Sequence, residues 1–394
     1  MISLGYNAVL VAVGAGLLGI AAGVTGTFLF LRKRALVGDA IAHATLPGVG
    51  LAFLLMVLLG GDGRNLAGLL LGAGFSAAFG LYCVHLISTR TRLAEDTAIG
   101  AVLSVFFGFG VLLLTVIQNV PSGRQAGLDG LLLGATAGML FADALLIAVG
   151  GAVALFASLA LSRAMVLVAF DEGYARVAGL KVDWVDLATM GLVLLVTVVG
   201  LKVVGLILIV ALLIIPAVAA RFWTDRAGQV AVLAGAIGGA SGVIGAIWSA
   251  TVPDLPTGPI IVLVAFGIFA VSMLLAPRRG VLAAWLRHRQ FQRQVHLRQG
   301  LLALGSGQPI YEQLTLRLLQ RAGLVRADGV ATPAGEQAVA DAARDEARWA
   351  LVRREKGLEA VAARAGIDPL DSLLTPDQVA DLDRKIANGE VAAP

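Results

Sequence analysis

Asp39 and His43 are the residues of this sequence whose types and spacing best suit chemistry. They lie in the apolar run GDAIAHATLPGVGLAFLLMVLL. The i, i+4 spacing places both side chains on one face of a helix. A carboxylate oxygen beside an imidazole nitrogen is half of a site for a divalent transition metal ion. The spacing also fits an Asp that caps the helix at a membrane interface and a His bonded to a neighbouring carbonyl, and on spacing alone this second interpretation is favoured.

The composition is that of a polytopic membrane protein. Hydrophobic residues make up 58% of the chain and the mean hydropathy is +0.88, whereas soluble domains have roughly 45–50% apolar residues. Glycine supplies 49 of the 394 residues, which suits close packing of helices in lipid. Ionisable groups at membrane depth are costly and usually face a bundle interior, a pathway or a partner. Asp39 and His43 are therefore candidate pathway residues.

Neither the single cysteine nor the N-terminus points to another class. Cys83 lies in an apolar stretch and, being alone, forms neither a disulfide within the chain nor a thiolate metal site. We interpret it as a small buried hydrophobic residue. The first 34 residues lack a basic n-region and their apolar run is too long for a cleavable signal, so we expect a first membrane helix there.

Nine apolar runs have about the length that crosses a bilayer, which is roughly 17–25 residues. They fall near 7–31, 39–60, 66–88, 97–117, 141–162, 185–201, 203–221, 229–251 and 258–276. The stretch 126–140 is apolar but short and interrupted by glycine, and we expect a re-entrant or tilted segment. Because the division at Lys202 is unclear from the sequence, the prediction is about eight to nine transmembrane helices.

Basic residues predict the orientation, because cytoplasmic loops carry an excess of Lys and Arg. Alternation over nine spans gathers most of them on one side: Arg32–Arg34, Arg90, Arg92, Arg163, Arg176, Lys181, Arg221, Arg226, Arg278 and Arg279. Arg64, Arg124 and Lys202 are the exceptions. We therefore expect the N-terminus outside and the C-terminus in the cytoplasm.

The density of charge divides the chain near residue 278. Of the 30 Lys and Arg residues 13 precede that position, and of the 26 Asp and Glu residues 12 do. The sequence thus predicts a transmembrane domain over 1–278 and a cytoplasmic domain over 279–394. The net charge of +4 gives no indication of nucleic-acid binding.

The most polar part of the predicted membrane domain is FDEGYARVAGLKVDWVD, residues 170–186. Asp171 and Glu172 suit the first turn of a short helix, where negative charge is favoured, and Gly179 suits a left-handed cap at its end. The segment is either an ordinary amphipathic connector or a docking helix for a cytoplasmic partner.

Two prolines lie inside predicted membrane helices, Pro47 and Pro216. Proline removes a backbone donor and kinks a helix, and neighbouring helices in a membrane can satisfy the freed carbonyl. Such a position marks either a gate or a purely structural kink.

The tail has the predicted order helix, helix, hairpin, helix, which is that of a winged-helix module. Asp328 and Gly329 form a strong turn pair, and Thr375 and Pro376 suit the N-cap and first position of a last helix. We expect a small α+β domain, with His288 and His296 on a solvated helix face.

No catalytic motif is present: the sequence contains no GxxxxGK[ST], GxSxG or HExxH pattern. It also has only four histidines. The chain is therefore not predicted to be an enzyme. Any uphill transport must take its energy from an ion gradient or from a partner ATPase.

Three motifs, in order and correctly separated, resemble the permease subunits of the bacterial zinc/manganese/iron ABC importers. They are LFLRKRALVGDAIAHATLPGVGLAFLL, FDEGYARVAGLKVDWVD and VVGLILIVALLIIPAVAARFWTDR. The resemblance covers residues 5–278. The tail is similar to the cytoplasmic extension of the longer manganese/iron-type permeases, which resembles winged-helix, iron-dependent repressors.

The resemblance implies an all-α polytopic permease of the type II importer kind in the bacterial inner membrane. Its implied partners are cytoplasmic ATP-binding subunits, a periplasmic or surface metal-binding protein and a second permease subunit, identical or related. No cofactor is bound permanently, because the divalent ion (Mn²⁺, Fe²⁺ or Zn²⁺) is the cargo. Asp39 and His43 are implied to line its path. The residues implied to couple to the ATPase are Phe170, Asp171, Glu172, Tyr174, Ala175, Gly179 and Leu180.

Two other functions stay open on the residues alone. In a secondary metal transporter or channel, Asp39 and His43 would form a proton relay, and an inverted repeat would favour that reading. In a membrane-tethered transcription regulator, the tail would be the active part.

Overall fold

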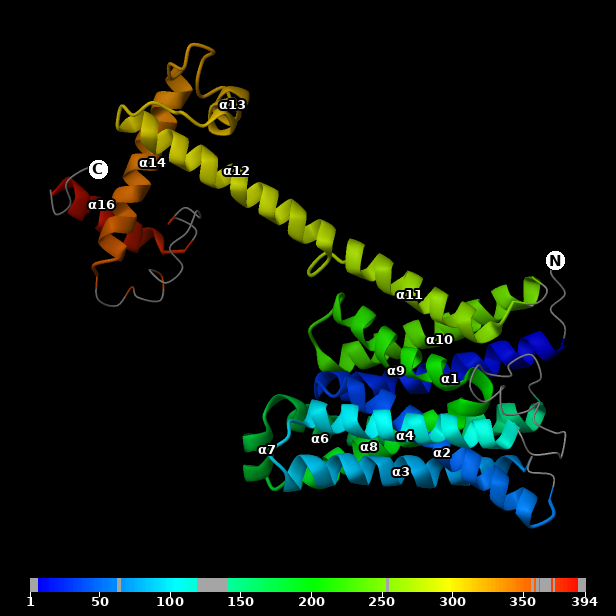
Figure 1. Cartoon of the computed structure of the whole chain (residues 1–394). Coiled ribbons are helices and arrows are strands. Elements are labelled where there is room, and N and C mark those ends of the chain that lie inside the picture. The colour runs from blue at the N-terminus through cyan, green and yellow to red at the C-terminus, as the bar shows by residue number, and fades with distance from the viewer. Residues whose placement is uncertain are drawn as a thin grey trace. The chain divides into compact units, whose positions relative to one another are not determined.

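The structure is a computed structural model that describes residues 6–61, 65–118, 140–252, 255–355, 358, 361, 370 and 373–388. The chain forms two units, Met1–Val281 and Leu282–Pro394. The helices of the first unit are α1 (Tyr6–Leu31), α2 (Ala35–Leu58), α3 (Leu66–Arg90), α4 (Glu95–Gln118), α6 (Phe141–Phe170), α7 (Glu172–Val177), α8 (Val182–Val204), α9 (Leu206–Arg221), α10 (Ala227–Thr251) and α11 (Thr257–Leu275) (Figure 1).

Eight of these helices are long and apolar enough to cross a membrane, counted over the described residues: α1, α2, α3, α4, α6, α8, α10 and α11. The ninth apolar run gives the shorter helix α9. The prediction of an all-α membrane protein with about eight to nine spans is therefore confirmed in its coarse form. The re-entrant segment expected over 126–140 lies, up to residue 139, outside the described residues.

The membrane helices form two packed groups that share α8 and α9. Helix α1 packs along α10 and also contacts α6 and α9, whereas α2 packs against α3 and α4. Helices α8 and α9 contact both groups, and their side chains Val193, Ile209 and Leu213 are fully buried. Figure 1 shows α7 at one end of this bundle, next to the end of α6. The end of the bundle that carries α7 is the one predicted from the basic loop residues to face the cytoplasm.

Glycine allows α1 and α10 to meet at backbone contact. A Cβ atom added to Gly19 would collide with the carbonyl oxygen of Gly238, and one added to Gly238 would collide with that of Gly19. Only residues without a side chain let two helix backbones approach this closely. The α1–α10 pair therefore depends on these two positions.

Helices α8 and α9 are joined by Gly205 alone. Its φ of +81° is one that residues with a Cβ rarely adopt. The chain thus reverses within a single residue, which is why the long apolar run around Lys202 resolves into two helices.

The second unit is helical in its described part, with α12 (Val281–Gly305) at its start, α13 (Gln313–Arg321), α14 (Pro333–Val352) and α16 (Pro376–Ala387). The core between α14 and α16 contains Trp349, which is 1% exposed, together with Leu374 and Leu382. Thr375 caps α16 through a reciprocal contact with Gln378. That cap agrees with the sequence prediction.

The predicted hairpin of this unit is much smaller than expected. Among its described residues the β structure is one isolated antiparallel bridge, Val325 to Ala331. Thr332 then caps α14 and Pro333 begins it, so no residues remain after Ala331 to form a second strand. The α+β winged-helix fold expected for the tail is therefore not seen.

The two histidines of α12 were both expected on a solvated face. His288 is exposed, but His296 is half-buried and its Nδ1 lies 3.0 Å from the Thr315 hydroxyl.

Candidate metal site and coupling segment

The candidate ligands lie on the face of α2 that the other described residues bury least. Between Ala35 and Gly50, Leu36 is exposed, Ala35, Asp39 and His43 are half-buried, and all other residues are buried. Beyond the buried Pro47, the same face continues with the exposed leucines Leu51, Leu55 and Leu58. The two polar residues thus interrupt an otherwise apolar stripe, which we call the α2 stripe.

Asp39 and His43 are spaced as adjacent ligands of one ion. The Asp39 Oδ1 and His43 Nε2 atoms are 3.4 Å apart, and the side chains are 36% and 21% exposed. Two ligands held roughly 2.0–2.1 Å from an ion at a tetrahedral angle lie roughly 3.3–3.4 Å from each other. An ion could therefore bind between the two atoms without rearrangement of α2.

The imidazole ring of His43 is fixed from its other side. It meets the ring of Phe107 on α4 edge-on, with centroids 5.0 Å apart and an interplanar angle of 83°. Its Nδ1 atom is buried and has no hydrogen-bond partner among the described residues. A proton relay through His43 consequently has no onward acceptor within the described part of one chain.

Asp39 and His43 by themselves would be only part of a metal site. No group of three or more His, Cys, Asp and Glu residues that could hold an ion is found in the described part of the chain.

Cys83 is half-buried on α3 and packs against the core, close to the role expected from the sequence. Pro47 lies one turn beyond His43 inside α2, and because it has no N–H it cannot donate to the His43 carbonyl. The gating role predicted for Pro47 and Pro216 stays a prediction.

The polar segment after α6 forms the short helix α7, with the local structure that its residues predict. Asp171 caps it by accepting a hydrogen bond of 2.8 Å from the Tyr174 amide, and Glu172 occupies the first turn. Gly179 has a φ of +86°, as expected for a helix end. Ala175 is fully buried against Val168 and Val182, which holds α7 to the ends of α6 and α8.

The outward side of this segment carries large apolar side chains among its charged ones. Phe170, Tyr174, Val177 and Trp184 are 64%, 60%, 87% and 66% exposed. Large side chains exposed together indicate an interaction surface. Phe170 and Tyr174 belong to the predicted coupling set, whereas Val177 and Trp184 were not predicted. Val177 follows Tyr174 by three residues, so helical spacing could have included it.

A network of ion pairs behind α7 was not predicted from the sequence. Arg32, in the turn between α1 and α2, donates to Asp186 on α8 from Nε at 3.0 Å and from Nη2 at 2.6 Å. Its Nη1 donates to the Val168 carbonyl at 3.0 Å and lies 3.5 Å from Glu172. One guanidinium group therefore contacts α6, α7 and α8.

Arg34 joins the same network from the other side of the turn. Its Nη1 is 2.9 Å from Asp186 and its Nε is 2.9 Å from Glu95 at the start of α4. Lys33 between the two arginines has a φ of +59°, an uncommon conformation for a residue with a Cβ. That turn directs both arginines to one carboxylate. The sequence shows Arg32–Arg34 only as a marker of orientation, because nothing in it pairs them with Asp186.

The first unit is a bundle of membrane-length apolar helices, and comparison with known proteins gives its family. The chain matches the ABC 3 transport family over residues 6–276 and belongs to that family. It is a multi-pass membrane permease of a bacterial ABC transport system and not the ATPase of that system.

Several relatives are similar over most of this region. The manganese transport system membrane protein MntC of Bacillus subtilis is 42% identical over 77% of this chain and 67% of its own length. The zinc transport system membrane protein TroC of Treponema pallidum is 42% identical over 71% of this chain and 92% of its own. The solved structure of PsaBC from Streptococcus pneumoniae in complex with Fab superposes with a TM-score of 0.60 at 29% identity, over 71% of this chain and 94% of that one.

Proposed function

We propose that this permease imports a divalent transition metal ion, Mn²⁺ in the first place and otherwise Fe²⁺ or Zn²⁺, past Asp39 and His43. The observation that carries the proposal is the 3.4 Å separation of Asp39 Oδ1 and His43 Nε2 on the α2 stripe. One oxygen and one nitrogen suit these ions, and the absence of a thiolate ligand gives no strong preference for Zn²⁺. The names of the manganese and zinc relatives support the same class of cargo.

The remaining ligands would come from a second permease subunit. The α2 stripe is apolar around the pair, so a second copy packed on it would bury the leucines and bring its own Asp39 and His43 to the same axis. The ion would then meet two oxygens and two nitrogens. Such a site must still release its ion to permit transport.

The energy would come from cytoplasmic ATP-binding subunits that contact the exposed side of α7. Because Arg32 binds both the α7 region and Asp186, a movement of α7 would reach the turn that starts α2. Asp39 follows Arg34 by five residues, about 7 Å along a rigid helix. A metal-binding protein on the outer side would deliver the ion.

Reconstitution tests this function. Proteoliposomes holding the permease, its ATPase and its binding protein should take up one of Mn²⁺, Fe²⁺ and Zn²⁺ only with ATP. Uptake that is independent of ATP and follows a proton gradient would instead identify a secondary transporter.

A variant tests the coupling segment. Glu172→Arg places a third cation beside Arg32 and Arg176, so ATP hydrolysis should continue with little uptake. Normal coupling in that variant would make residues 170–182 a simple connector.

For the tail, whose described elements are helices and one isolated β-bridge, we expect no nucleic-acid binding. Purified full-length protein should not retain duplex DNA at physiological salt. Specific retention would favour the tethered-regulator alternative.

A further inference from the structure

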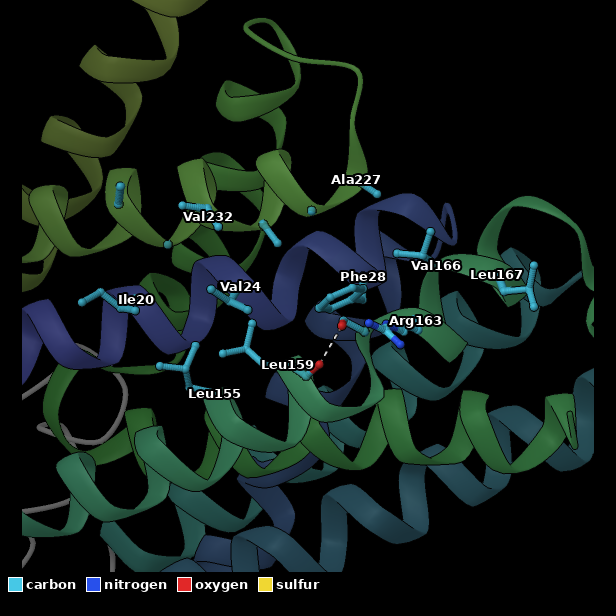
Figure 2. A pocket seen from close by; sticks show the side chains of 15 residues that line it. Ile20, Val24, Phe28, Leu155, Leu159, Arg163, Val166, Leu167, Ala227 and Val232 are labelled. Atoms are coloured by element: carbon cyan, nitrogen blue, oxygen red, sulfur yellow. Dashed lines mark hydrogen bonds between the residues drawn. The ribbon is translucent and has the colours of Figure 1, made fainter.

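A long apolar groove lies between α6 and α10 on the surface of α1. Figure 2 shows its floor, made by Ile20, Val24 and Phe28 at successive turns of α1. Leucines of α6, among them Leu159, form one wall, and small residues of α10 form the other. The cavity has a volume of about 850 Å³, and because these helices are membrane spans it opens toward the bilayer.

Only two of the side chains that line the groove are polar, Ser162 and Arg163. The Ser162 hydroxyl already donates to the Leu159 carbonyl at 2.6 Å. Arg163 is exposed, and no acidic residue lines the groove with it. Its guanidinium group has no ion-pair partner among the described residues. A cation that faces lipid without a carboxylate is costly, so an anion from outside the chain would stabilise it.

The groove and its cation have the polarity of a phospholipid. Arg163 precedes the end of α6 at Phe170 by seven residues, about 10 Å of helix, so its long side chain can reach the interface at the α7 end of the bundle. Guanidinium binds phosphate through paired hydrogen bonds. The apolar floor and walls suit acyl chains. Basic pockets between membrane helices on the cytoplasmic side are known to bind anionic headgroups.

We propose that this groove binds an anionic phospholipid, with the phosphate on Arg163 and the acyl chains along α1. A second copy of the chain is the other possible occupant. However, the copy that completes the proposed metal site would face α2, which packs against α3 and α4, whereas the groove is built from α1, α6 and α10. The lipid site does not depend on transport and is tested without it.

The experiment compares spin-labelled phosphatidylglycerol and phosphatidylcholine bound to the full-length protein in phosphatidylcholine nanodiscs. The unmodified protein should prefer phosphatidylglycerol. Arg163→Gln should weaken that preference roughly tenfold, since it removes a charge-assisted contact, and Arg163→Lys should retain much of it. Leu159→Trp should displace lipid by filling the groove while leaving the charge in place.

Arg90→Gln is the matched control, because Arg90 is an exposed arginine at the end of α3 outside the groove. It should leave the preference unchanged. An equal preference in Arg163→Gln and the unmodified protein, each monodisperse on size-exclusion, would overturn the proposal. So would a disulfide between two copies of Leu159→Cys in a Cys83→Ser background, which would make the groove a protein interface.

Discussion

The guanidinium group of Arg32 binds the carboxylate of Asp186 through two hydrogen bonds, and both side chains are largely buried, at 14% and 15% exposure. Desolvation lowers the pKa of Arg32, but the hydrogen bond and charge of Asp186, together with Glu172, outweigh it and raise the pKa above its ordinary value. The Arg32 guanidinium therefore stays charged. The pair connects the turn before α2, which holds Asp39 and His43, to the segment on which an ATPase would act.

Replacing Asp186 with Asn should uncouple ATP hydrolysis from uptake. The change leaves Arg32 and Arg34 without their shared carboxylate, so a displacement of α7 no longer reaches α2. We expect ions transported per ATP hydrolysed to fall several-fold while ATP hydrolysis continues. The readout is that ratio in proteoliposomes, with assembly verified by size-exclusion.

The control for this prediction is Asp225→Asn, which breaks the pairs of Asp225 with Arg221 and Arg279 away from α7. Its ratio should match that of the unmodified protein. If Asp186→Asn keeps the normal ratio of ions transported to ATP hydrolysed, or if both variants lower that ratio equally, the Arg32–Asp186 pair does not couple α7 to α2.

Asp39→Asn and His43→Gln should each reduce metal uptake at least about tenfold, because each removes one of the two ligands that the chain supplies. Both variants should still assemble with the ATPase. His85→Gln is the matched control, since His85 is an exposed histidine on α3 and should tolerate the change. Radioactive ⁵⁴Mn uptake measures all three. Uptake at the normal rate in either ligand variant would disprove the site.

Uptake should also fall on acidification, because the imidazole of His43 binds a metal ion only when it is neutral and protons compete for Nε2. The comparison is between about pH 7.5 and about pH 5.5, with ATP hydrolysis measured alongside to correct for any loss in the partner subunits. Equal corrected uptake at both pH values would rule out a histidine ligand.

In the tail, hydrogen bonds from Arg348 lower the pKa of Asp383 below its ordinary range, against the opposing effect of desolvation. A lowered carboxyl pKa adds stability above the unfolded-state pKa of about 4, and that stability is lost as the pH falls through the folded-state pKa. The contribution is at most about 1 kcal/mol because Asp383 is partly exposed. Amide hydrogen exchange of α16 in the full-length protein should therefore accelerate below about pH 4, relative to intrinsic rates. Asp383→Asn should weaken that dependence and leave the part due to Asp381, whose pKa is also lowered, by its hydrogen bond with Lys385.

The sequence predicted what local chemistry determines. The apolar runs set the membrane helices because length and hydropathy suffice, and Asp39 and His43 are paired because helical spacing alone brings them together. Asp171 and Gly179 likewise determine the two ends of α7. Each of these relationships spans only a few residues.

Contacts between distant segments were not predictable in the same way. Arg32 and Asp186 are 154 positions apart, and only the packing of α1, α6 and α8 brings them together. The groove beside Arg163 likewise arises from three separate helices. In the tail, the Asp328–Gly329 turn was correct, but Pro333 begins a helix so soon afterwards that no sheet can form around it.

The backbone contact between α1 and α10 predicts that Gly238→Ala destabilises the membrane bundle. Its added methyl would collide with the Gly19 carbonyl, and because both atoms belong to rigid helices the α1–α10 pair must separate. Overpacking of this kind costs about 1–3 kcal/mol. Gly267→Ala on α11 is the control, since its methyl would meet nothing within 4 Å and alanine favours a helix. Heating each variant in detergent and measuring the monodisperse fraction should show a lower midpoint for Gly238→Ala alone. Equal midpoints would mean that α1 and α10 are not held at backbone contact by Gly19 and Gly238.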